Sequence, residues 1–244
     1  MQPRHVLMIK PGEAAESIRL EVGDYDRWFQ SALPEEPVQF DIVRPYLGES
    51  LPADVREYDA VLVTGSPLTA AQPTDWMKKT ASYMVDAAEK RVPVLGVCFG
   101  HQLLGMVMGV PVVKSPAGRE IGTVEIALTE DGWRDPLFEG LPARFPTQTT
   151  HEDVVPKLPL GARLLASNDA SAVQAMALGK YLRGVQFHPE LSSEGVKSVI
   201  RSREAIIDKE GEAQGEVRRA RRLLEGVRPT PYGKQVLQNF LTRF

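Results

Sequence analysis

The sequence is poor in cysteine, in long apolar runs and in net charge, and each shortage excludes a class of protein. A single cysteine among 244 residues rules out an intramolecular disulfide and a cysteine-based zinc cluster. No apolar run approaches the roughly 18 residues that cross a bilayer, so we expect no membrane association. The first residues show no secretory signal, and this predicts a cytoplasmic location.

The composition is otherwise that of an ordinary folded protein. The hydrophobic fraction is 43% and the charged fraction is 25%, and these values predict a globular chain. A formal net charge of -3 argues against a dedicated nucleic-acid binder. Because we find no repeat and no low-complexity linker, we interpret residues 1–244 as one domain, with a core at about 4–190 and a helical tail at 191–244.

The tail is more basic than the rest of the chain. Its densest cluster, Arg218-Arg219-Ala220-Arg221-Arg222, is interpreted as a solvated helix face with acidic neighbours rather than as a binding patch. Four apolar residues near the end repeat at helical spacing and are expected to join the core: Val236, Leu237, Phe240 and Leu241. Periodicity leaves three roles open for the tail, which are capping a sheet edge, forming a homodimer and docking a second protein.

Short apolar runs alternate with amphipathic stretches in the first hundred residues. We expect strands at 5–9, 38–43, 60–63 and 93–97, and a helix at 75–90. The order strand, helix, strand predicts a parallel sheet with right-handed crossovers. Shorter strands are expected further along the chain at 123–128, 162–166, 172–177 and 181–187, with turns at Asp131-Gly132 and at 178–180.

The single cysteine stands where a buried strand passes directly into an apolar helix. The segment Gly96-Val97-Cys98-Phe99-Gly100 has the pattern of a nucleophile elbow with cysteine in place of serine. In so tight a turn, side chains at Gly96 and Gly100 would collide with neighbouring backbone. We expect the Cys98 sulfur to lie above the carboxyl ends of the strands and at a helix amino terminus, which favours the thiolate. The alternative is a small buried hydrophobic residue.

A second group of polar residues follows the last expected strand. In Gly184-Val185-Gln186-Phe187-His188-Pro189-Glu190, a candidate base, His188, stands at a strand end, and Glu190 follows on the same side of an extended chain. We expect His188 to activate Cys98 and the Glu190 carboxylate to orient the imidazole. A structural role is the alternative for a lone histidine, but its combination with an elbow cysteine favours catalysis.

A third signal is Thr64-Gly65-Ser66-Pro67, at the end of the strand that precedes the cysteine motif. A tight glycine turn there would direct the N–H of Ser66 towards the sulfur. With the N–H of Phe99, it would form an oxyanion hole. Taken alone this is an ordinary turn sequence, so the prediction depends on Cys98.

Together these segments resemble the class I, triad-type glutamine amidotransferase domain over roughly 4–190. The motifs from Gly96 to Gln102 and from Gly184 to Glu190 carry the resemblance. Weaker matches at Arg119-Glu120-Ile121-Gly122 and Thr150-His151-Glu152-Asp153 point to the free-standing, GMP synthase-like subgroup. The resemblance implies a three-layer, flavodoxin-like α/β fold, in which an open, mostly parallel sheet has helices on both faces and a helical extension follows.

The resemblance also implies roles for individual residues. Cys98 would be the nucleophile, His188 the general base and Glu190 its orienting carboxylate, with backbone oxyanion donors at Ser66 and Phe99. Four residues would line the substrate pocket: Gly65, Gln102, His151 and Asp153.

Two positions depart from the family pattern. Ser66 stands where the family often has a second glycine, and Glu152 stands where relatives commonly have glycine, which brings an extra carboxylate to the pocket. His101 is a spare histidine, and we expect it to be structural.

The implied reaction is hydrolysis of the glutamine side-chain amide to glutamate and ammonia, without a metal or a cofactor. The sequence has no Gly-x-x-x-x-Gly-Lys-Ser/Thr phosphate loop, so an ammonia acceptor would lie on a separate synthetase chain. The first alternative is a hydrolase or transferase of γ-glutamyl peptides that uses the same triad. The second is a non-catalytic binding or regulatory module, which would tolerate the loss of Cys98.

Overall fold

The computed structural model describes residues 3–33 and 37–244, so Met1 and Gln2 of the amino-terminal segment lie outside it. Its large sheet has the order β2 (Val38–Val43), β1 (Arg4–Ile9), β3 (Ala60–Val63), β4 (Val94–Val97), β11 (Leu182–Val185), β10 (Ala175–Leu178), β9 (Arg163–Ser167), β6 (Glu120–Leu128) and β7 (Arg144–His151). Neighbouring strands from β2 to β11 run parallel, and those from β11 to β7 run antiparallel. A separate short pair joins β5 (Val113–Lys114) to β8 (Asp153–Val154).

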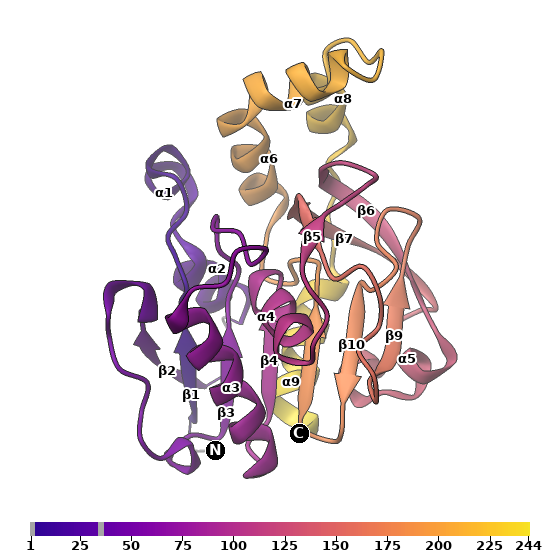
Figure 1. Ribbon diagram of the computed structural model, residues 1–244. Helices are drawn as coiled ribbons and strands as arrows, with labels where there is room; N and C mark the ends of the chain where they lie inside the picture. The colour runs from indigo at the N-terminus through magenta and orange to yellow at the C-terminus, as the bar shows by residue number, and fades with distance from the viewer. Residues whose placement is uncertain (1–2, 34–36) are drawn as a thin grey trace.

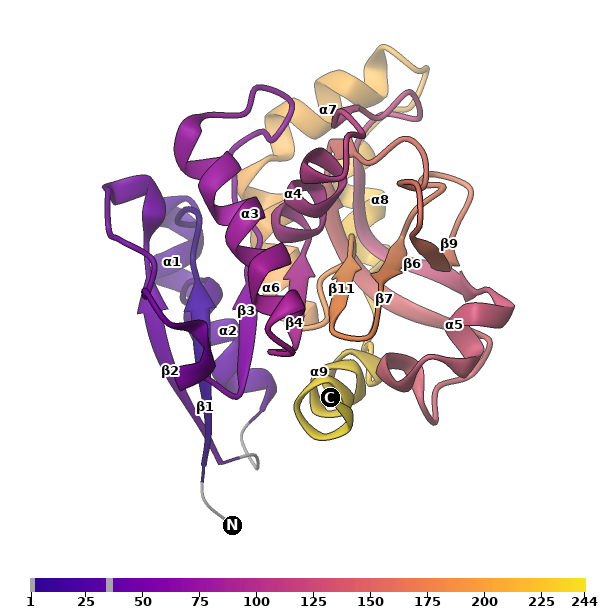
Figure 2. The ribbon, with the colours of Figure 1, turned by 60° about the horizontal axis from the view of Figure 1, so that its bottom comes forward.

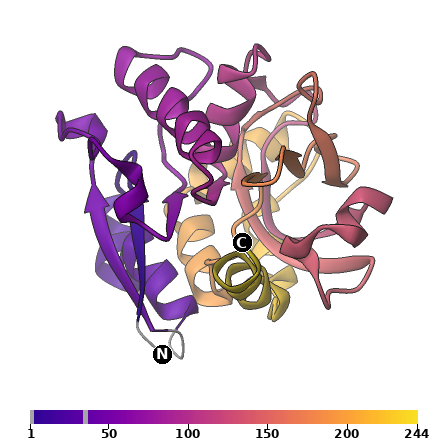
Figure 3. The ribbon, with the colours of Figure 1, turned by 90° about the horizontal axis from the view of Figure 1, so that it is seen from below.

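Helices cover both faces of the parallel strands, as Figure 3 shows from below. On one face lie α3 (Asp75–Glu89) and α4 (Phe99–Val107), and on the other lie α2 (Tyr25–Ala32) and α9 (Tyr232–Arg243). Every residue of β3 and β4 is buried, which explains why these central strands are continuous apolar runs. The predicted three-layer α/β fold with a mostly parallel central sheet is confirmed.

The last helix of the tail belongs to the core, and Figure 2 shows it beneath the sheet. Its predicted apolar face is confirmed, because four side chains are buried there: Val236, Leu237, Phe240 and Leu241. Asn239 donates from Nδ2 to the carbonyls of Leu137 and Glu139, at 3.0 and 2.9 Å. The start of α9 lies directly on the chain at Pro189, since a β-carbon at Gly233 would be 2.4 Å from the Pro189 carbonyl oxygen.

The other tail helices stand above the carboxyl ends of the parallel strands, at the top of Figure 1. They are α6 (Ser193–Ser202), α7 (Glu204–Glu212) and α8 (Arg219–Gly226), and α6 packs between α1 (Glu16–Val22) and the strands β6 and β7. A separate hydrophobic cluster, which includes Ile18, Val199 and Ile207, holds these helices together. The tail therefore forms one wall above the sheet edge at which parallel α/β folds bind ligands.

The basic cluster of the tail lies on the outside of this wall. Arg221 pairs with Glu225 at 2.9 Å and Arg222 with Glu216 at 3.2 Å, and the two arginine side chains are 66% and 52% exposed. The predicted solvated face with acidic neighbours is confirmed for Arg221 and Arg222. Arg219 instead turns inward, where its side chain is 15% exposed and donates to the carbonyl of Arg119 at 3.0 Å.

One predicted turn is wrong. Asp131-Gly132 lies in a short helix, α5 (Glu130–Arg134), because the Thr129 hydroxyl accepts a hydrogen bond from the N–H of Gly132 at 3.0 Å and caps the helix. The turn predicted at 178–180 is confirmed, since β10 and β11 form an antiparallel hairpin around it.

Short 3₁₀ helices are also present, at Pro45–Leu47, Val55–Glu57 and Pro136–Phe138. In the described part of the chain, no helix combines the length and the apolar character that crossing a membrane requires.

Candidate active site

Cys98 occupies a sharp turn between β4 and α4. Its φ is 50° and its ψ is -96°, a conformation that is strained for a residue with a side chain. A β-carbon at Gly96 would lie 2.6 Å from the carbonyl of Gly100, and one at Gly100 would lie 2.7 Å from the carbonyl oxygen of Val63. The close backbone approach therefore requires both glycines, as predicted. The turn holds the cysteine at the amino end of α4.

His188 follows β11, the strand that lies parallel to β4 and beside it. In their register Val97 is opposite Val185, and the N–H of Cys98 donates to the Val185 carbonyl at 2.8 Å. Cys98 and His188 therefore leave the same edge of the sheet from neighbouring strands. The Nδ1 of His188 lies 2.6 Å from the Oε1 of Glu190, so this carboxylate orients the ring.

Gly65, in the loop after β3, lies between the imidazole and the cysteine. A β-carbon at this position would be 2.8 Å from Cε1 of His188, 3.1 Å from Cε1 of Tyr25 and 3.7 Å from Cβ of Cys98. Three side chains from separate parts of the chain thus meet around one glycine. Tyr25, at the start of α2, is a site residue that no sequence pattern predicted.

The charges of this buried group act on one another. Burial alone would lower the pKa of His188, but the negative charges of Glu190 and Cys98 raise it to about 10. Burial and the charge of Cys98 raise the pKa of Tyr25, so its phenol keeps its proton. The Nε2 of His188 has no oxygen or nitrogen partner among the described residues. This nitrogen is therefore available for proton transfer.

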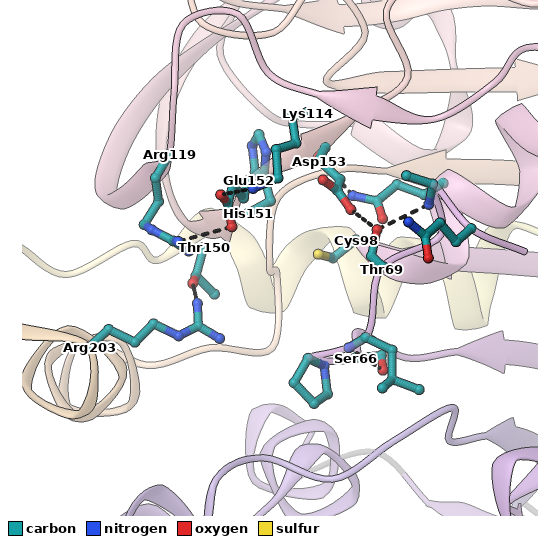
Figure 4. Close-up of a pocket in the computed structure, with 15 residues that line it drawn as sticks. Ser66, Thr69, Cys98, Lys114, Arg119, Thr150, His151, Glu152, Asp153 and Arg203 are labelled. Carbon is teal, nitrogen blue, oxygen red and sulfur yellow. Dashed lines mark hydrogen bonds and ion pairs between the residues drawn. The ribbon is translucent and has the colours of Figure 1, made fainter. Parts of the chain in front are cut away.

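A cavity of about 490 Å³ opens in front of the sulfur (Figure 4). The hydroxyl of Ser66 donates to the carbonyl of Pro11 at 3.2 Å, whereas its N–H donates to no described residue. The N–H of Phe99 lies in the first turn of α4, where a helix supplies no internal acceptor. The N–H groups of the two predicted oxyanion donors are thus free of acceptors in the described backbone.

Gln102 and Asp153 are joined at one side of this cavity. The Nε2 of Gln102 donates to the backbone carbonyl of Asp153 at 2.8 Å, and the Thr69 hydroxyl donates to the Asp153 carboxylate. No cation of the described chain forms an ion pair with that carboxylate. Asp153 therefore presents negative charge to the cavity that it lines.

His151 also lines the cavity, and a second carboxylate holds it from behind. Its Nε2 lies 2.8 Å from the Oε2 of Glu120, which also accepts from Gln174 at 2.8 Å, while Asn168 donates to the other Glu120 oxygen at 2.6 Å. Burial tends to raise the pKa of Glu120, but these hydrogen bonds and the charge of His151 lower it. The Nδ1 of His151 is buried and has no hydrogen-bond partner among the described residues.

The outer rim carries two paired cations. Arg119 forms ion pairs with Glu152 and with Glu210 of α7, both at 3.0 Å, and Lys114 pairs with Glu152 at 2.9 Å. Glu152, the carboxylate that departs from the family pattern, is therefore neutralised by its own neighbours. The pair with Glu210 also ties the tail to the rim.

A third cation, Arg203, reaches the cavity from the junction of α6 and α7. Its Nη1 donates to the Thr150 hydroxyl at 2.8 Å. No carboxylate within residues 3–33 and 37–244 forms an ion pair with it. No motif predicted Arg203 or Glu210, because only the folding of the tail brings them to the site.

His101 lies away from the cavity, against β11. A β-carbon at Gly184 would be 2.8 Å from its Nδ1, and burial lowers the pKa of His101 to about 3, so the ring is neutral. His101 is fully buried and does not line the cavity, in agreement with the expected structural role. Over the described residues, no group of three or more His, Cys, Asp or Glu side chains could hold a metal ion.

Comparison with known proteins supports one family. The family model described as glutamine amidotransferase class-I matches residues 24–206. Gamma-glutamyl peptidase 5 from Arabidopsis thaliana is 30% identical over 202 residues, which are 82% of this chain and 80% of the relative. A glutamine-hydrolysing GMP synthase subunit from Saccharolobus solfataricus is 33% identical over 139 residues, 57% of this chain and 70% of the relative. The crystal structure of a glutamine amidotransferase from Thermotoga maritima superposes with a TM-score of 0.76 and 25% identity, covering 100% of this chain and 98% of the other.

Proposed function

The chain belongs to the class-I glutamine amidotransferase family, and from this premise we propose that Cys98, His188 and Glu190 are the catalytic triad of a hydrolase acting on γ-glutamyl amides. The observation that carries the proposal is the approach of the imidazole and the cysteine around Gly65. The 2.6 Å contact between His188 and Glu190 supports it further, because a carboxylate at Nδ1 leaves Nε2 to face the reacting atoms.

In the proposed reaction the Cys98 thiolate attacks the γ-carbonyl carbon of the bound substrate. The carbonyl oxygen becomes an oxyanion, the carbon–nitrogen bond then breaks, and the imidazolium of His188 gives its proton to the leaving amine. A water molecule, deprotonated by the same imidazole, attacks the thioester and releases glutamate and the thiolate. The raised pKa of His188 suits this cycle, because it keeps the proton on the ring until the amine leaves.

Two backbone groups would stabilise the oxyanion. The N–H of Phe99 and the N–H of Ser66 are the proposed donors, and neither donates to the described backbone. Each donor would lower the barrier by about 3–4 kcal/mol. The strained backbone of Cys98 holds the sulfur in place for attack, so little reorganisation is needed.

The glutamyl part of the substrate would lie on the side of Gln102 and Asp153. The Asp153 carboxylate is suited to a protonated α-amino group, and His151 lines the same cavity beside it. Gly65 has no side chain to separate the imidazole from the cysteine beside this part of the cavity. These four residues are our proposed substrate-binding set.

The identity of the leaving amine divides the proposal in two. If the amine is ammonia, the chain is a glutaminase serving a separate synthetase, and the relative described as a GMP synthase subunit favours this form. If the amine is an amino acid or a peptide, the chain is a γ-glutamyl peptidase, and the relative from Arabidopsis thaliana favours that form. Both use the same residues and neither needs a metal or a cofactor. We assign either form to the cytoplasm, where the thiol of Cys98 stays reduced.

The test is the release of glutamate from glutamine and from γ-glutamyl dipeptides. We expect Cys98→Ala to lose at least about 10⁴-fold in kcat/KM and still to fold, because the change removes one buried atom and introduces no clash. Arg221→Gln, on the exposed face of α8, is the matched control and keeps full activity. If Cys98→Ala keeps the wild-type rate, or if the wild type releases no glutamate from any of these substrates, the proposal fails and a non-catalytic role takes its place.

A further inference from the structure

Arg203 differs from the other cations of the cavity in forming no ion pair with a described carboxylate. Lys114 and Arg119 are both paired with carboxylates of the rim, whereas the guanidinium of Arg203 makes one hydrogen bond, to a neutral hydroxyl. Burial and the like charge of Arg119 lower the pKa of Arg203, against the opposing charge of Cys98. A partly desolvated guanidinium with unused donors is a binding site for a carboxylate from outside the chain.

Asp153 is the complementary case at the other side of the cavity. Its carboxylate is held by a hydroxyl and forms no ion pair within the described chain. Figure 4 shows Asp153 and Arg203 on opposite sides of Cys98. Among the described residues, the cavity therefore has an unpaired negative group at one end, an unpaired positive group at the other and the reactive sulfur between them.

The position of the sulfur decides which part of a substrate meets each charge. The γ-carbonyl carbon must lie at Cys98, so the glutamyl group and the leaving amine extend in opposite directions from it. Asp153 matches the α-amino group of the glutamyl part, and the other direction leads to Arg203. The α-carboxylate of the substrate belongs to the glutamyl part, on the side of Asp153. When glutamine is the substrate, the leaving group is ammonia, so no carboxylate extends towards Arg203.

We propose that Arg203 binds the carboxylate of the amino acid or peptide that leaves, so that γ-glutamyl peptides with a free carboxyl group are the preferred substrates. This inference rests on the proposed function of Cys98, His188 and Glu190, and it selects the peptidase form over the glutaminase form. The cavity of about 490 Å³ is in the range of sites that enclose ligands larger than one amino acid. Arg203 is a specificity-determining residue, and it takes no part in the bond-breaking steps.

The experiment compares γ-glutamylalanine with γ-glutamylalaninamide, which differ only in the carboxylate, and adds glutamine as a third substrate. In the wild type we expect kcat/KM to favour the free acid by about 10- to 100-fold, the size of a charge-assisted hydrogen bond. In Arg203→Gln the preference falls to near one, through a higher KM for the acid at nearly constant kcat, while the amide and glutamine are hydrolysed at wild-type rates. Arg203→Lys keeps a charge without the planar fork and retains an intermediate preference.

Arg201→Gln is the matched control, because Arg201 lies two residues away in the last turn of α6 and pairs with Glu21 outside the cavity. It should leave the preference for the acid unchanged. The inference is overturned if Arg203→Gln keeps the preference, or if it impairs the acid, the amide and glutamine equally. A wild type that hydrolyses all three substrates without favouring the acid overturns the role of Arg203 alone, whereas a wild type that hydrolyses none overturns the proposed function as well. If Arg203→Gln does not fold, an Arg203→Lys variant with the full wild-type preference contradicts the inference.

Discussion

The inner wall of the cavity and its outer rim are built in different ways. The inner wall consists of residues at the ends of neighbouring strands, and Cys98, His188 and Glu190 are each at most 5% exposed there. The rim is assembled from the short β5–β8 pair, the chain before β6 and the tail. The exposed fraction of its cationic side chains ranges from 7% at Arg119 to 78% at Lys114. The register of the sheet thus sets the positions of the residues proposed to react. The packing of the tail helices brings in the residues proposed to determine substrate preference.

Mutations in the inner wall and in the outer rim should therefore have different consequences. A change at the inner wall alters reacting atoms or displaces them, so it should lower kcat and leave the ranking of substrates unchanged. A change at the rim should alter KM and the ranking of substrates. Each of the following variants tests whether this division holds.

After Cys98→Ala, the largest effect is expected from Glu190→Gln, at the inner wall. The amide keeps the size of the side chain but removes the charge that holds the His188 imidazolium, so kcat/KM should fall by about 10³- to 10⁴-fold. A loss below about tenfold would contradict the role of Glu190 as the orienting carboxylate. Glu120→Gln, in the second carboxylate–histidine pair, is the matched control and should cost far less.

Glu190→Gln should also change how stability and activity depend on pH. The pKa of His188 is about 10 in the native state, above its unfolded value, so this group contributes stability below about pH 6.5 and loses it as the pH rises through 10. Wild-type activity should fall over the same alkaline limb as the imidazolium loses its proton. In Glu190→Gln the alkaline loss of stability and the alkaline loss of activity should both move to lower pH, because the charge that raises the pKa of His188 is gone. Melting temperatures and pH–rate profiles measure the two shifts.

A smaller loss is expected from Gly65→Ala, which changes the geometry of the inner wall and none of its charges. The new methyl group would lie 2.8 Å from the His188 ring and must displace it, and a displacement of about 1 Å costs about 10²-fold in kcat. Gly226→Ala, where a β-carbon meets nothing within 4 Å, is the matched control and should be silent. Equal rates for the two variants would show that the imidazole position is not constrained at Gly65.

The smallest effect is expected from Glu210→Gln, at the rim. Glu210 is 26% exposed and shares Arg119 with Glu152, so its loss should destabilise the fold by about 1–2 kcal/mol. KM for γ-glutamyl peptides should rise a few-fold, with kcat nearly unchanged, because α7 carries Arg203 at its start. Glu225→Gln breaks an exposed pair of the same tail and should cost less than about 0.5 kcal/mol. Chemical denaturation and steady-state kinetics distinguish the two variants. A large loss of kcat in Glu210→Gln would contradict the expectation that rim residues affect KM and not kcat.

The inner wall could be predicted from the sequence because its determinants are local. Gly96 and Gly100 flank the cysteine within five residues, and His188 is two residues from Glu190, so single motifs describe both groups. The parallel strands were predicted for a similar reason, since strands buried on both faces are continuous apolar runs. The register that places the two motifs side by side follows from the topology of the fold.

The rim could not be predicted, because no local pattern specifies it. Arg203 reaches the cavity only when α6 packs on α1, and α1 and α2 are helices of 7 and 8 residues, too short for a clear periodicity. The strand β7 was also missed, because Pro146 and a run of polar residues argue against a strand. An edge strand tolerates such a proline, and β7 is the last strand of its sheet.

The contact between Gly233 and Pro189 has a consequence for how this protein can change. It brings the two ends of the segment at 191–232 together, so α6, α7 and α8 form an insertion that leaves and rejoins the core at one place, and α9 completes that core. Such an insertion can be shortened, lengthened or exchanged without disrupting the strand pairing of the sheet, as an inserted loop can. Transplanting this segment between relatives is therefore a direct route to new leaving-group preferences on an unaltered nucleophile.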